Sequence, residues 1–198
     1  MNPVDIANSY DQIAERWLGA NLSENGITQH ERALAFLENK RYALDIGCGC
    51  SGRVIDLLLR HAFQVEGIDV SERMIELAKQ RHPEVTLWHA DICEWRLPRQ
   101  YDCISAWDSV WHVPLVSQEL VLRKMMEGLA PGGVCIFTTP GLGAPSEKVD
   151  SAMGPQMYYS GLGIPRTLEL VAETGCICRH LEYDQHPELH LYLVVQRA

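Results

Sequence analysis

The 198-residue sequence has no run of basic residues, and its formal net charge at pH 7 is −9. A protein that grips the phosphate backbone of DNA or RNA needs a positive surface, so we expect no nucleic-acid partner. The sequence also lacks a long apolar stretch. Its longest apolar clusters, such as residues 55–59, are far shorter than the roughly 20 residues that cross a bilayer. We therefore expect no membrane partner.

The sequence lacks export and metal signatures as well. Its first residues, MNPVDIANSYDQ, have neither the positive region nor the apolar stretch of a signal peptide. The seven cysteines are scattered and form no C-x-x-C pair, which favours reduced thiols in the cytoplasm. Cys48 and Cys50 have no partner ligands at zinc spacing, and Pro187 prevents a helix that would pair His186 with His190. We expect no metal.

The remaining pattern alternates strands and helices over a length that suits a single domain, residues 1–198. This alternation predicts a mostly parallel α/β sheet with helices on both faces. The predicted helices are 4–18, 28–37, 53–61, 72–81, 118–129 and 166–173. The predicted strands are 43–46, 64–68, 85–88, 102–106, 134–139, 176–183 and 189–196, of which the last two form an antiparallel hairpin.

Several boundaries have their own signals. Thr28, with Glu31 three residues later, predicts a capping box, and Ser71 predicts a helix cap. Residues 131–133, Pro-Gly-Gly, predict a turn before the fifth strand. Residues 140–163 are rich in Gly, Pro, Ser and Met without a clean period, and loops of this length are often lids or binding loops.

The most informative segment is residues 42–69, an apolar strand followed by a glycine-rich turn, a helix, a second strand and an acid. Gly47, Gly49 and Gly52 have G-x-G-x-x-G spacing. Glycine lets the backbone approach a ligand closely, and the helix that follows offers free N–H groups to an anion. Asp69, at the end of the next strand, can accept both hydroxyls of a ribose. The segment therefore predicts a nucleotide-type cofactor site.

Later segments resemble one family. His89-Ala90-Asp91-Ile92, then Ala106-Trp107-Asp108-Ser109 and Leu129-Ala130-Pro131-Gly132-Gly133, follow LDIGCGCSG and GIDVS in order. This ordered set resembles the class I S-adenosylmethionine (SAM)-dependent methyltransferases, and most closely those that act on small molecules. The resemblance implies a Rossmann-like methyltransferase fold, a seven-stranded sheet with a C-terminal antiparallel strand, and S-adenosylhomocysteine as the product.

The resemblance also implies which residues bind the cofactor. They are Tyr10, Asp45, Gly47, Cys48, Gly49, Asp69, Val70, Met74, Asp91, Ile92 and Trp107. Asp45 and the first two glycines would lie under the methionine part of SAM, Asp69 would hold the ribose, and Asp91 would accept from the adenine amino group.

The resemblance also implies roles for the other residues of that set. Val70 and Met74 would flank the adenine, and the Ile92 backbone would meet its ring. Trp107 follows the strand whose backbone holds the amino group of SAM. Tyr10 lies in a helix that would fold over the cofactor, so that residues 1–39 would act as lid helices.

Transfer of a sulfonium methyl group needs mainly orientation and exclusion of water. His112 and Asp108 follow the fourth strand, where they could take a proton from an acceptor. Packing or hydrogen bonding is the alternative for both. Substrate contacts are possible for Trp111, Tyr158, Tyr159 and Arg166. The first three could instead belong to core or lid packing, and Arg166 could be a surface charge.

The predicted function is methyl transfer from SAM to a small molecule by a cytoplasmic monomer or homodimer. One alternative is an NAD(P)-dependent oxidoreductase, because the glycines and the acid fit it equally well. Another is a SAM-binding protein without catalysis. The sequence names neither the acceptor nor the methylated atom.

Overall fold

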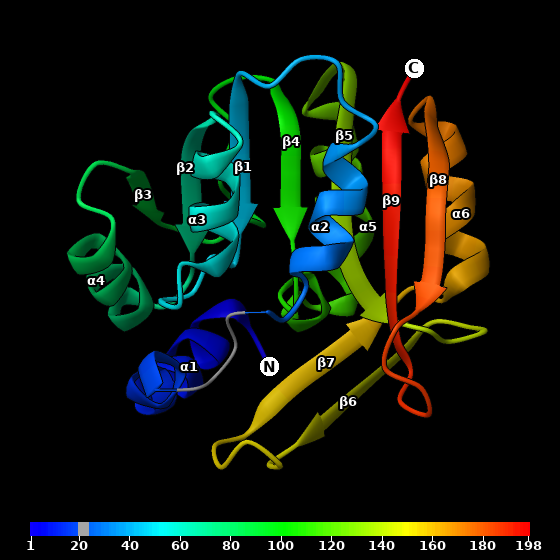
Figure 1. Cartoon of the computed structure of the whole chain (residues 1–198). Coiled ribbons are helices and arrows are strands. Elements are labelled where there is room, and N and C mark those ends of the chain that lie inside the picture. The colour runs from blue at the N-terminus through cyan, green and yellow to red at the C-terminus, as the bar shows by residue number, and fades with distance from the viewer. Residues whose placement is uncertain (20–23) are drawn as a thin grey trace.

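A seven-stranded sheet forms the centre of the computed structural model, which describes residues 1–19 and 24–198 (Figure 1). In spatial order the strands are β3 (Thr86–His89), β2 (Gln64–Asp69), β1 (Tyr42–Ile46), β4 (Tyr101–Ala106), β5 (Leu129–Pro140), β9 (His190–Arg197) and β8 (Cys176–Tyr183). The first five are parallel, and β9 is antiparallel to both of its neighbours. The predicted fold class is therefore confirmed, including the C-terminal hairpin.

Helices cover both faces of this sheet. They are α2 (Ile27–Leu34), α3 (Arg53–Arg60), α4 (Glu72–Arg81), α5 (Leu115–Glu127) and α6 (Ile164–Glu173). Successive side chains of a buried strand point to opposite faces. Leu44 and Ile46 accordingly pack in the core shared with α5 and α6, whereas Ala43 packs in the core shared with α2, α3 and α4. Figure 1 shows α2 and α3 on the near face and α5 and α6 behind the sheet.

Of the two predicted helix caps, one is confirmed and one is wrong. Ser71 caps α4 as predicted, because its hydroxyl accepts from the Met74 N–H. The capping box at Thr28 is wrong. Gly26, in the left-handed region at φ 79°, precedes α2, which starts at Ile27 without a side-chain cap. Within residues 1–39, expected to act as lid helices, α2 packs against β5 through a core that contains Ala33.

Two predictions of irregular backbone are wrong. Residues 131–133 lie within β5, and the irregularity is a register shift in which Tyr101 pairs with Leu129 but Cys103 pairs with Val134. Residues 140–163 contain an antiparallel pair, β6 (Ser146–Asp150) and β7 (Met157–Gly161). Neither strand shows the alternation of buried and exposed residues that is typical of a strand with one solvent face. β6 is exposed along most of its length, and β7 is buried along most of its length.

The helix α1 (Pro3–Gly19) and the β6–β7 pair lie beyond the carboxyl ends of the parallel strands (Figure 1). The α1 carboxylate of Asp11 accepts from the Ser71 hydroxyl at 2.5 Å, which ties α1 to α4. On the other side, the Ser9 hydroxyl donates to the Gln156 carbonyl at 2.7 Å. We call α1 together with β6 and β7 the roof.

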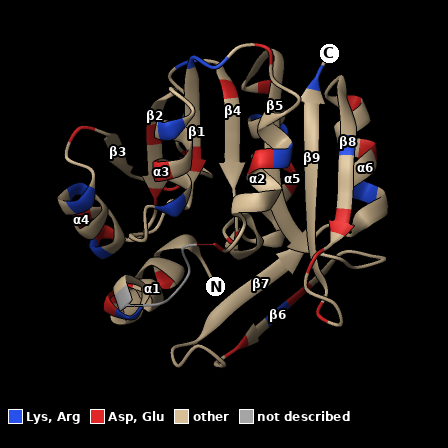
Figure 2. Cartoon of the chain, in the orientation of Figure 1, with Lys and Arg blue, Asp and Glu red and all other residues tan. Residues whose placement is uncertain are grey.

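Charges of both signs are interspersed in the view of Figure 2, which shows no basic face. In the two described ranges, no helix is long and apolar enough to cross a membrane.

Candidate active site

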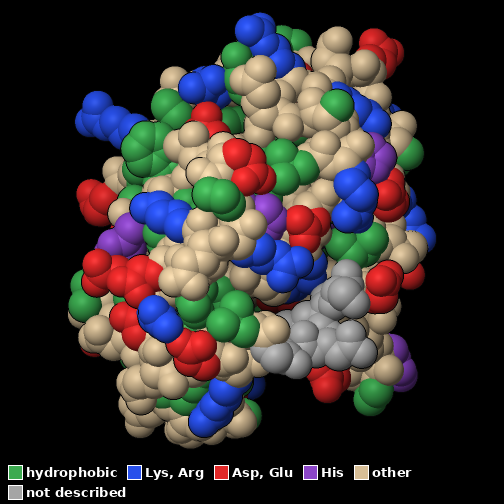
Figure 3. Space-filling view, turned by 60° about the vertical axis from the view of Figure 1, so that its left-hand side comes forward, with side chains coloured by type: hydrophobic (Ala, Val, Ile, Leu, Met, Phe, Trp, Pro, Cys, Tyr) green, Lys and Arg blue, Asp and Glu red, His purple; other side chains and the backbone are tan. Residues whose placement is uncertain are grey.

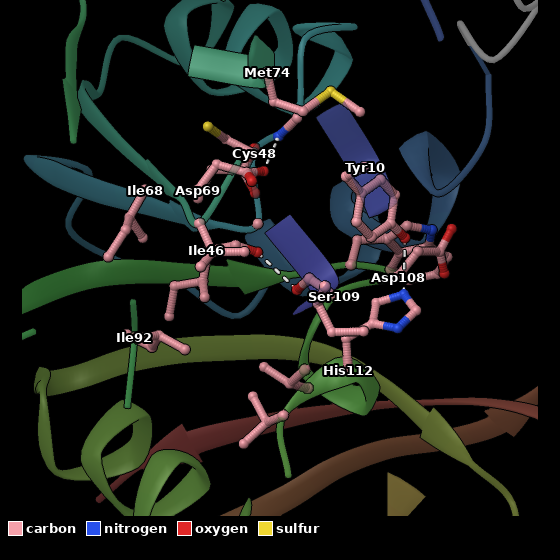
Figure 4. Close-up of a pocket in the computed structure, with 18 of the residues that line it drawn as sticks. Tyr10, Ile46, Cys48, Ile68, Asp69, Met74, Ile92, Asp108, Ser109 and His112 are labelled. Atoms are coloured by element: carbon pink, nitrogen blue, oxygen red, sulfur yellow. Dashed lines mark hydrogen bonds between the residues drawn. The ribbon is translucent and has the colours of Figure 1, made fainter. Parts of the chain in front are cut away.

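A cavity lies between the carboxyl ends of β1, β2 and β4 and the α1 part of the roof. All eleven residues expected to bind the cofactor line it, together with His112 and Asp108. Figure 4 shows the labelled side chains around this space, with Asp69 and Met74 on one side and Tyr10, Asp108 and His112 on the other. In the space-filling view of Figure 3, the surface is hollowed between the upper and the lower part of the molecule. Ligands of open α/β sheets bind at this edge.

The glycine turn forms one wall of the cavity. The N–H groups of Gly47 and Cys48 both donate to the Ile68 carbonyl, so the turn is fastened to the end of β2. A Cβ on Gly47 would lie 2.2 Å from the Ser109 Cβ, so this position is closed by packing. Gly49 has a φ of 56°, and a Cβ built on it would meet no atom within 4 Å. A side chain at Gly49 would therefore enter space that a bound ligand could use.

Asp69 stands at the end of β2 with both carboxylate oxygens engaged. One accepts from the Gly49 N–H at 2.8 Å and the other from the Ser71 N–H at 2.9 Å. Burial raises the pKa of Asp69, and these two hydrogen bonds oppose the rise. Each carboxylate oxygen has a second lone pair, so the group can still accept from a diol.

Asp45 is the buried acid of β1. It is 4% exposed, and burial raises its pKa to about 7, against the opposing hydrogen bond from Ser105 and the charge of Arg53. Ser105 also lies 2.9 Å from Nε2 of His30. Asp45 is therefore a wall residue whose charge at neutral pH is reduced by its surroundings.

The segment after β3 forms the opposite end of the cavity. One Asp91 oxygen accepts from the Cys93 N–H at 2.8 Å, which turns the chain sharply. The ammonium group of Lys124 donates to the carbonyls of Ile92, Cys93 and Trp95 at 2.6, 3.0 and 2.8 Å. Lys124 thus fixes the shape of residues 91–95. No local sequence pattern indicates this role, because Lys124 lies on α5, which follows another strand.

Apolar side chains close the cavity beside Asp69. Met74 is buried in a small cluster with Cys50 and Ala14, against which Tyr10 and Trp17 pack. Val70 is half-buried and also lines the cavity. These contacts give one side of the cavity a surface suited to a flat apolar group.

His112 lies in the short 3₁₀ helix η1 (Val110–His112) with both ring nitrogens engaged. Nδ1 lies 2.7 Å from the Tyr158 carbonyl, which can only accept, so Nδ1 carries the proton. Nε2 therefore accepts from the Tyr10 hydroxyl at 2.8 Å and from the Trp111 N–H at 3.0 Å. Burial lowers the pKa of His112 to about 4. The ring is neutral at physiological pH and holds α1 to η1.

Asp108 belongs to a second buried chain of polar groups. Its φ is 54°, in the left-handed region that Asp tolerates better than most residues. One carboxylate oxygen lies 2.9 Å from Nε2 of His190, and Nδ1 of His190 lies 2.5 Å from Asp184. The sequence had singled out His190 only to discount it as a metal ligand, and its real partners come from β4 and from the β8–β9 turn.

Trp107, expected at the cofactor, and the expected substrate residues are placed less uniformly. Trp107 lines the cavity, and its ring packs against Tyr192 and His190. Trp111 and Tyr159 pack on the His112 ring from behind the cavity wall.

Two of those residues have partners of their own. The Tyr158 hydroxyl donates to Glu147 and accepts from the Leu115 N–H, so its ring spans the roof and α5. Arg166 is not brought to the cavity. Its guanidinium pairs with Glu119 and Glu173 between α5 and α6, and this network accounts for its charge. Within the described ranges, no three potential metal ligands lie together.

Comparisons with known proteins agree with this architecture. Residues 43–133 match the family model described as a methyltransferase domain. The chain is 34% identical over 122 residues to trans-aconitate 2-methyltransferase of Acidovorax sp. (strain JS42), covering 60% of this chain and 46% of that protein. It is 30% identical over 96 residues to a dTDP-3-amino-3,4,6-trideoxy-alpha-D-glucopyranose N,N-dimethyltransferase of Streptomyces venezuelae, covering 47% and 40%. The chain therefore spans less than half the length of these relatives.

Among solved structures, one similar fold is the Burkholderia thailandensis 1,6-didemethyltoxoflavin-N1-methyltransferase with bound 1,6-didemethyltoxoflavin and S-adenosylhomocysteine. Its TM-score is 0.75 at 16% identity, and the alignment covers 99% of this chain and 87% of that one. At this identity the likeness concerns the fold alone.

Proposed function

We propose that this chain, which belongs to the class I S-adenosylmethionine-dependent methyltransferase family, transfers a methyl group from SAM to a small-molecule acceptor. The observation that carries the proposal is the glycine turn at the end of β1. Gly49 leaves open space at the cavity wall, and its N–H is bonded to the acid that ends β2. A cradle that a Cβ would fill, next to an acid with spare lone pairs, fits an amino acid joined to a ribose.

The residues of the cavity would divide the cofactor between them. Gly47, Cys48 and Gly49, with Asp45, would lie along the methionine part, and Asp69 would accept from the ribose hydroxyls. At the far end, Val70, Met74 and Ile92 would flank the adenine, and Asp91 would accept from its amino group. Trp107 and Tyr10 would close the space from β4 and α1.

The bound cofactor would supply an electrophilic methyl group on a positively charged sulfur. The protein would then have to hold the acceptor in line with that methyl group and exclude water, and orientation of this kind can supply about 7–11 kcal/mol. The roof suits this task, because Tyr10 and His112 fasten α1 over the cavity. His112 would act by holding Tyr10, since its Nε2 is already occupied by two donors.

The small acceptor is supported by the size of the roof and by the acidic charge. The roof consists of one helix and one strand pair. We propose that residues 1–198 act as one methyltransferase domain, with α1 as the lid and residues 140–163 as the acceptor-side insertion. A net charge of −9 disfavours nucleic acid as the acceptor. We further propose that the protein works in the cytoplasm as a monomer or homodimer.

Calorimetry separates this proposal from its alternatives. SAM and S-adenosylhomocysteine should bind, whereas NAD and NADP should not. A release assay for S-adenosylhomocysteine with a panel of metabolites should then give turnover. Binding of NAD in preference to SAM would indicate an oxidoreductase. SAM binding without turnover of any metabolite would indicate a binding protein.

A further inference from the structure

The side chains around the cavity carry more negative than positive charge. Four aspartates line it: Asp45, Asp69, Asp91 and Asp108. Arg53 is the one lysine or arginine among the described lining residues. Residues 20–23, whose sequence is Ala-Asn-Leu-Ser, contribute no charged side chain. An acceptor with several carboxylates would therefore meet repulsion from this lining.

Arg53 does little to offset this imbalance, because its guanidinium already has partners. Its Nε donates to the Asn25 carbonyl at 3.1 Å, and its Nη1 donates to the Ser51 hydroxyl at 3.0 Å. The remaining nitrogen, Nη2, lies 3.9 Å from an Asp108 oxygen. The positive charge of Arg53 is thus partly offset by the negative charge of Asp108.

Asp108 is the cavity acid best placed for an acceptor. Asp69 and Asp91 are assigned to the cofactor, and Asp45 is almost fully buried. The Asp108 side chain is 27% exposed and lies across the cavity from Asp69, beside Tyr10 (Figure 4). Asp108 follows β4, on the side of the cavity away from the adenine end at Asp91.

The orientation of the Asp108 carboxylate is fixed by a hydrogen-bonded chain through His190 and Asp184. His190 bridges Asp108 and Asp184 through its two nitrogens, and the Gln29 amide donates to the second Asp184 oxygen at 2.7 Å. Burial lowers the pKa of His190, but the hydrogen bonds to Asp108 and Asp184 raise it by more, so the net shift is upward. The two carboxylates share one ring that carries at most one positive charge, so negative charge remains on Asp108, which lines the cavity beside Arg53.

We infer that the acceptor is an amine that binds as an ammonium ion opposite Asp108; this rests on the proposed methyl transfer. The charge of the lining disfavours a polycarboxylate, and the fixed carboxylate offers a partner that a neutral hydroxyl would use less well. Asp108 would bind the ammonium group and accept its proton, and His190 and Asp184 would be positioning residues.

The reaction balances with groups that are present. The bound ammonium group gives one proton to the Asp108 carboxylate, which frees the nitrogen lone pair. That lone pair bonds to the methyl carbon as the carbon–sulfur bond breaks, and the electron pair of that bond stays on sulfur. The products are a methylated ammonium ion and S-adenosylhomocysteine, and the proton on Asp108 passes to water when they leave.

An acceptor panel tests the inference with the wild-type protein. Small primary amines are compared with the alcohol and the carboxylate of the same carbon skeleton, with trans-aconitate added as a tricarboxylate. Release of S-adenosylhomocysteine is measured for each. We expect the best amine to have a kcat/KM at least tenfold above those of its alcohol and carboxylate counterparts.

Two variants complete the test. Asp108→Asn removes the charge and tolerates the same backbone angles. It should lower kcat/KM for the best amine at least tenfold, through KM and kcat together, because the amide neither pairs with the ammonium group nor takes its proton. The dissociation constant for SAM should stay within twofold. Glu84→Gln removes one charge from an exposed position outside the cavity, and it should leave both quantities unchanged.

Three results would overturn the inference while methyl transfer stands. They are a carboxylate or an alcohol as the best acceptor, SAM binding with no amine turned over, and an Asp108→Asn protein within twofold of wild type on the best amine. The wild-type panel decides the question even if Asp108→Asn does not fold. Failure to bind SAM at all would instead refute the proposed function.

Discussion

The phenol oxygen of Tyr10 lies 2.8 Å from Nε2 of His112, and this hydrogen bond joins α1 to the segment after β4. The second nitrogen of the ring faces the Tyr158 carbonyl on β7. One imidazole therefore connects both parts of the roof to the floor of the cavity. Because the Tyr158 carbonyl can only accept, the lone pair of His112 points at Tyr10 and not at an open space.

This arrangement makes His112 a structural residue in our prediction. His112→Ala removes partners from three buried or half-buried groups, and leaving a buried group unsatisfied costs about 1–3 kcal/mol. We expect a clear fall in Tm and a kcat within about tenfold of wild type. General-base catalysis would instead be worth about 10²–10⁴ in rate. A loss of that size in kcat, without a fall in Tm, would restore the catalytic role.

His30 should make stability depend on pH. Burial lowers its pKa to about 4, and its nitrogens contact the Gly26 carbonyl and the Ser105 hydroxyl. Between pH 6.5 and 4 the unfolded chain binds a proton that the folded protein excludes, so stability falls as pH falls.

The matched variant for this effect is His30→Gln, which does not titrate. Between pH 7 and 5 the unfolding free energy of wild type should drop by about 2 kcal/mol more than that of His30→Gln. Urea denaturation at both pH values measures the difference. Equal drops would mean that His30 keeps an ordinary pKa in the folded protein.

Removing the Asp69 charge should weaken SAM binding. A hydrogen bond to a charged group contributes roughly 1.5–3 kcal/mol. Asp69→Asn should therefore raise the dissociation constant for SAM at least tenfold, while one oxygen remains to accept from a backbone N–H. Calorimetry measures the change, and an unaltered constant would place the ribose elsewhere.

Gly49 and Gly132 form a matched pair for the glycine turn. Both have positive φ, and a Cβ on either would meet no atom within 4 Å, but Gly132 does not line the cavity. Each substitution by valine should cost a similar strain, roughly 1–2 kcal/mol. Only Gly49→Val should abolish SAM binding. Loss of binding in both variants would point to general damage instead of a filled cradle.

Lys124 should affect the adenine end of the cavity without touching a ligand. Lys124→Met removes three hydrogen bonds to the carbonyls of residues 92, 93 and 95. We expect the dissociation constant for SAM to rise about threefold to tenfold. Lys79→Met, on the exposed side of α4, serves as the control. The Lys124→Met protein should lose affinity for adenosine in the same proportion as for SAM, whereas its affinity for methionine should not change.

The part of the site that the residues predict by themselves, without the family resemblance, is encoded within one strand–turn–helix–strand unit. Gly47, Gly49 and Asp69 are close in sequence, and their roles depend on local backbone geometry. The contributions of Lys124 and His190 depend on contacts across 32 and 82 residues, which no local pattern records. The β6–β7 pair was missed for a related reason, since neither strand alternates between polar and apolar residues.

The roof consists of two segments, residues 3–19 and 146–161, while the floor is the sheet edge itself. Each segment makes polar contacts with the rest of the molecule, such as those of Tyr10 and Asp11 from α1 and those of Tyr158 and Ser160 from β7. In the proposed function, the shape and the charge of the acceptor would be recognised by different parts of the chain. Exchanging the roof segments for others of similar length should change which acceptor shapes fit. Asp108, which lies outside the roof, would still select an amine, and the strand ends assigned to the cofactor would stay as they are.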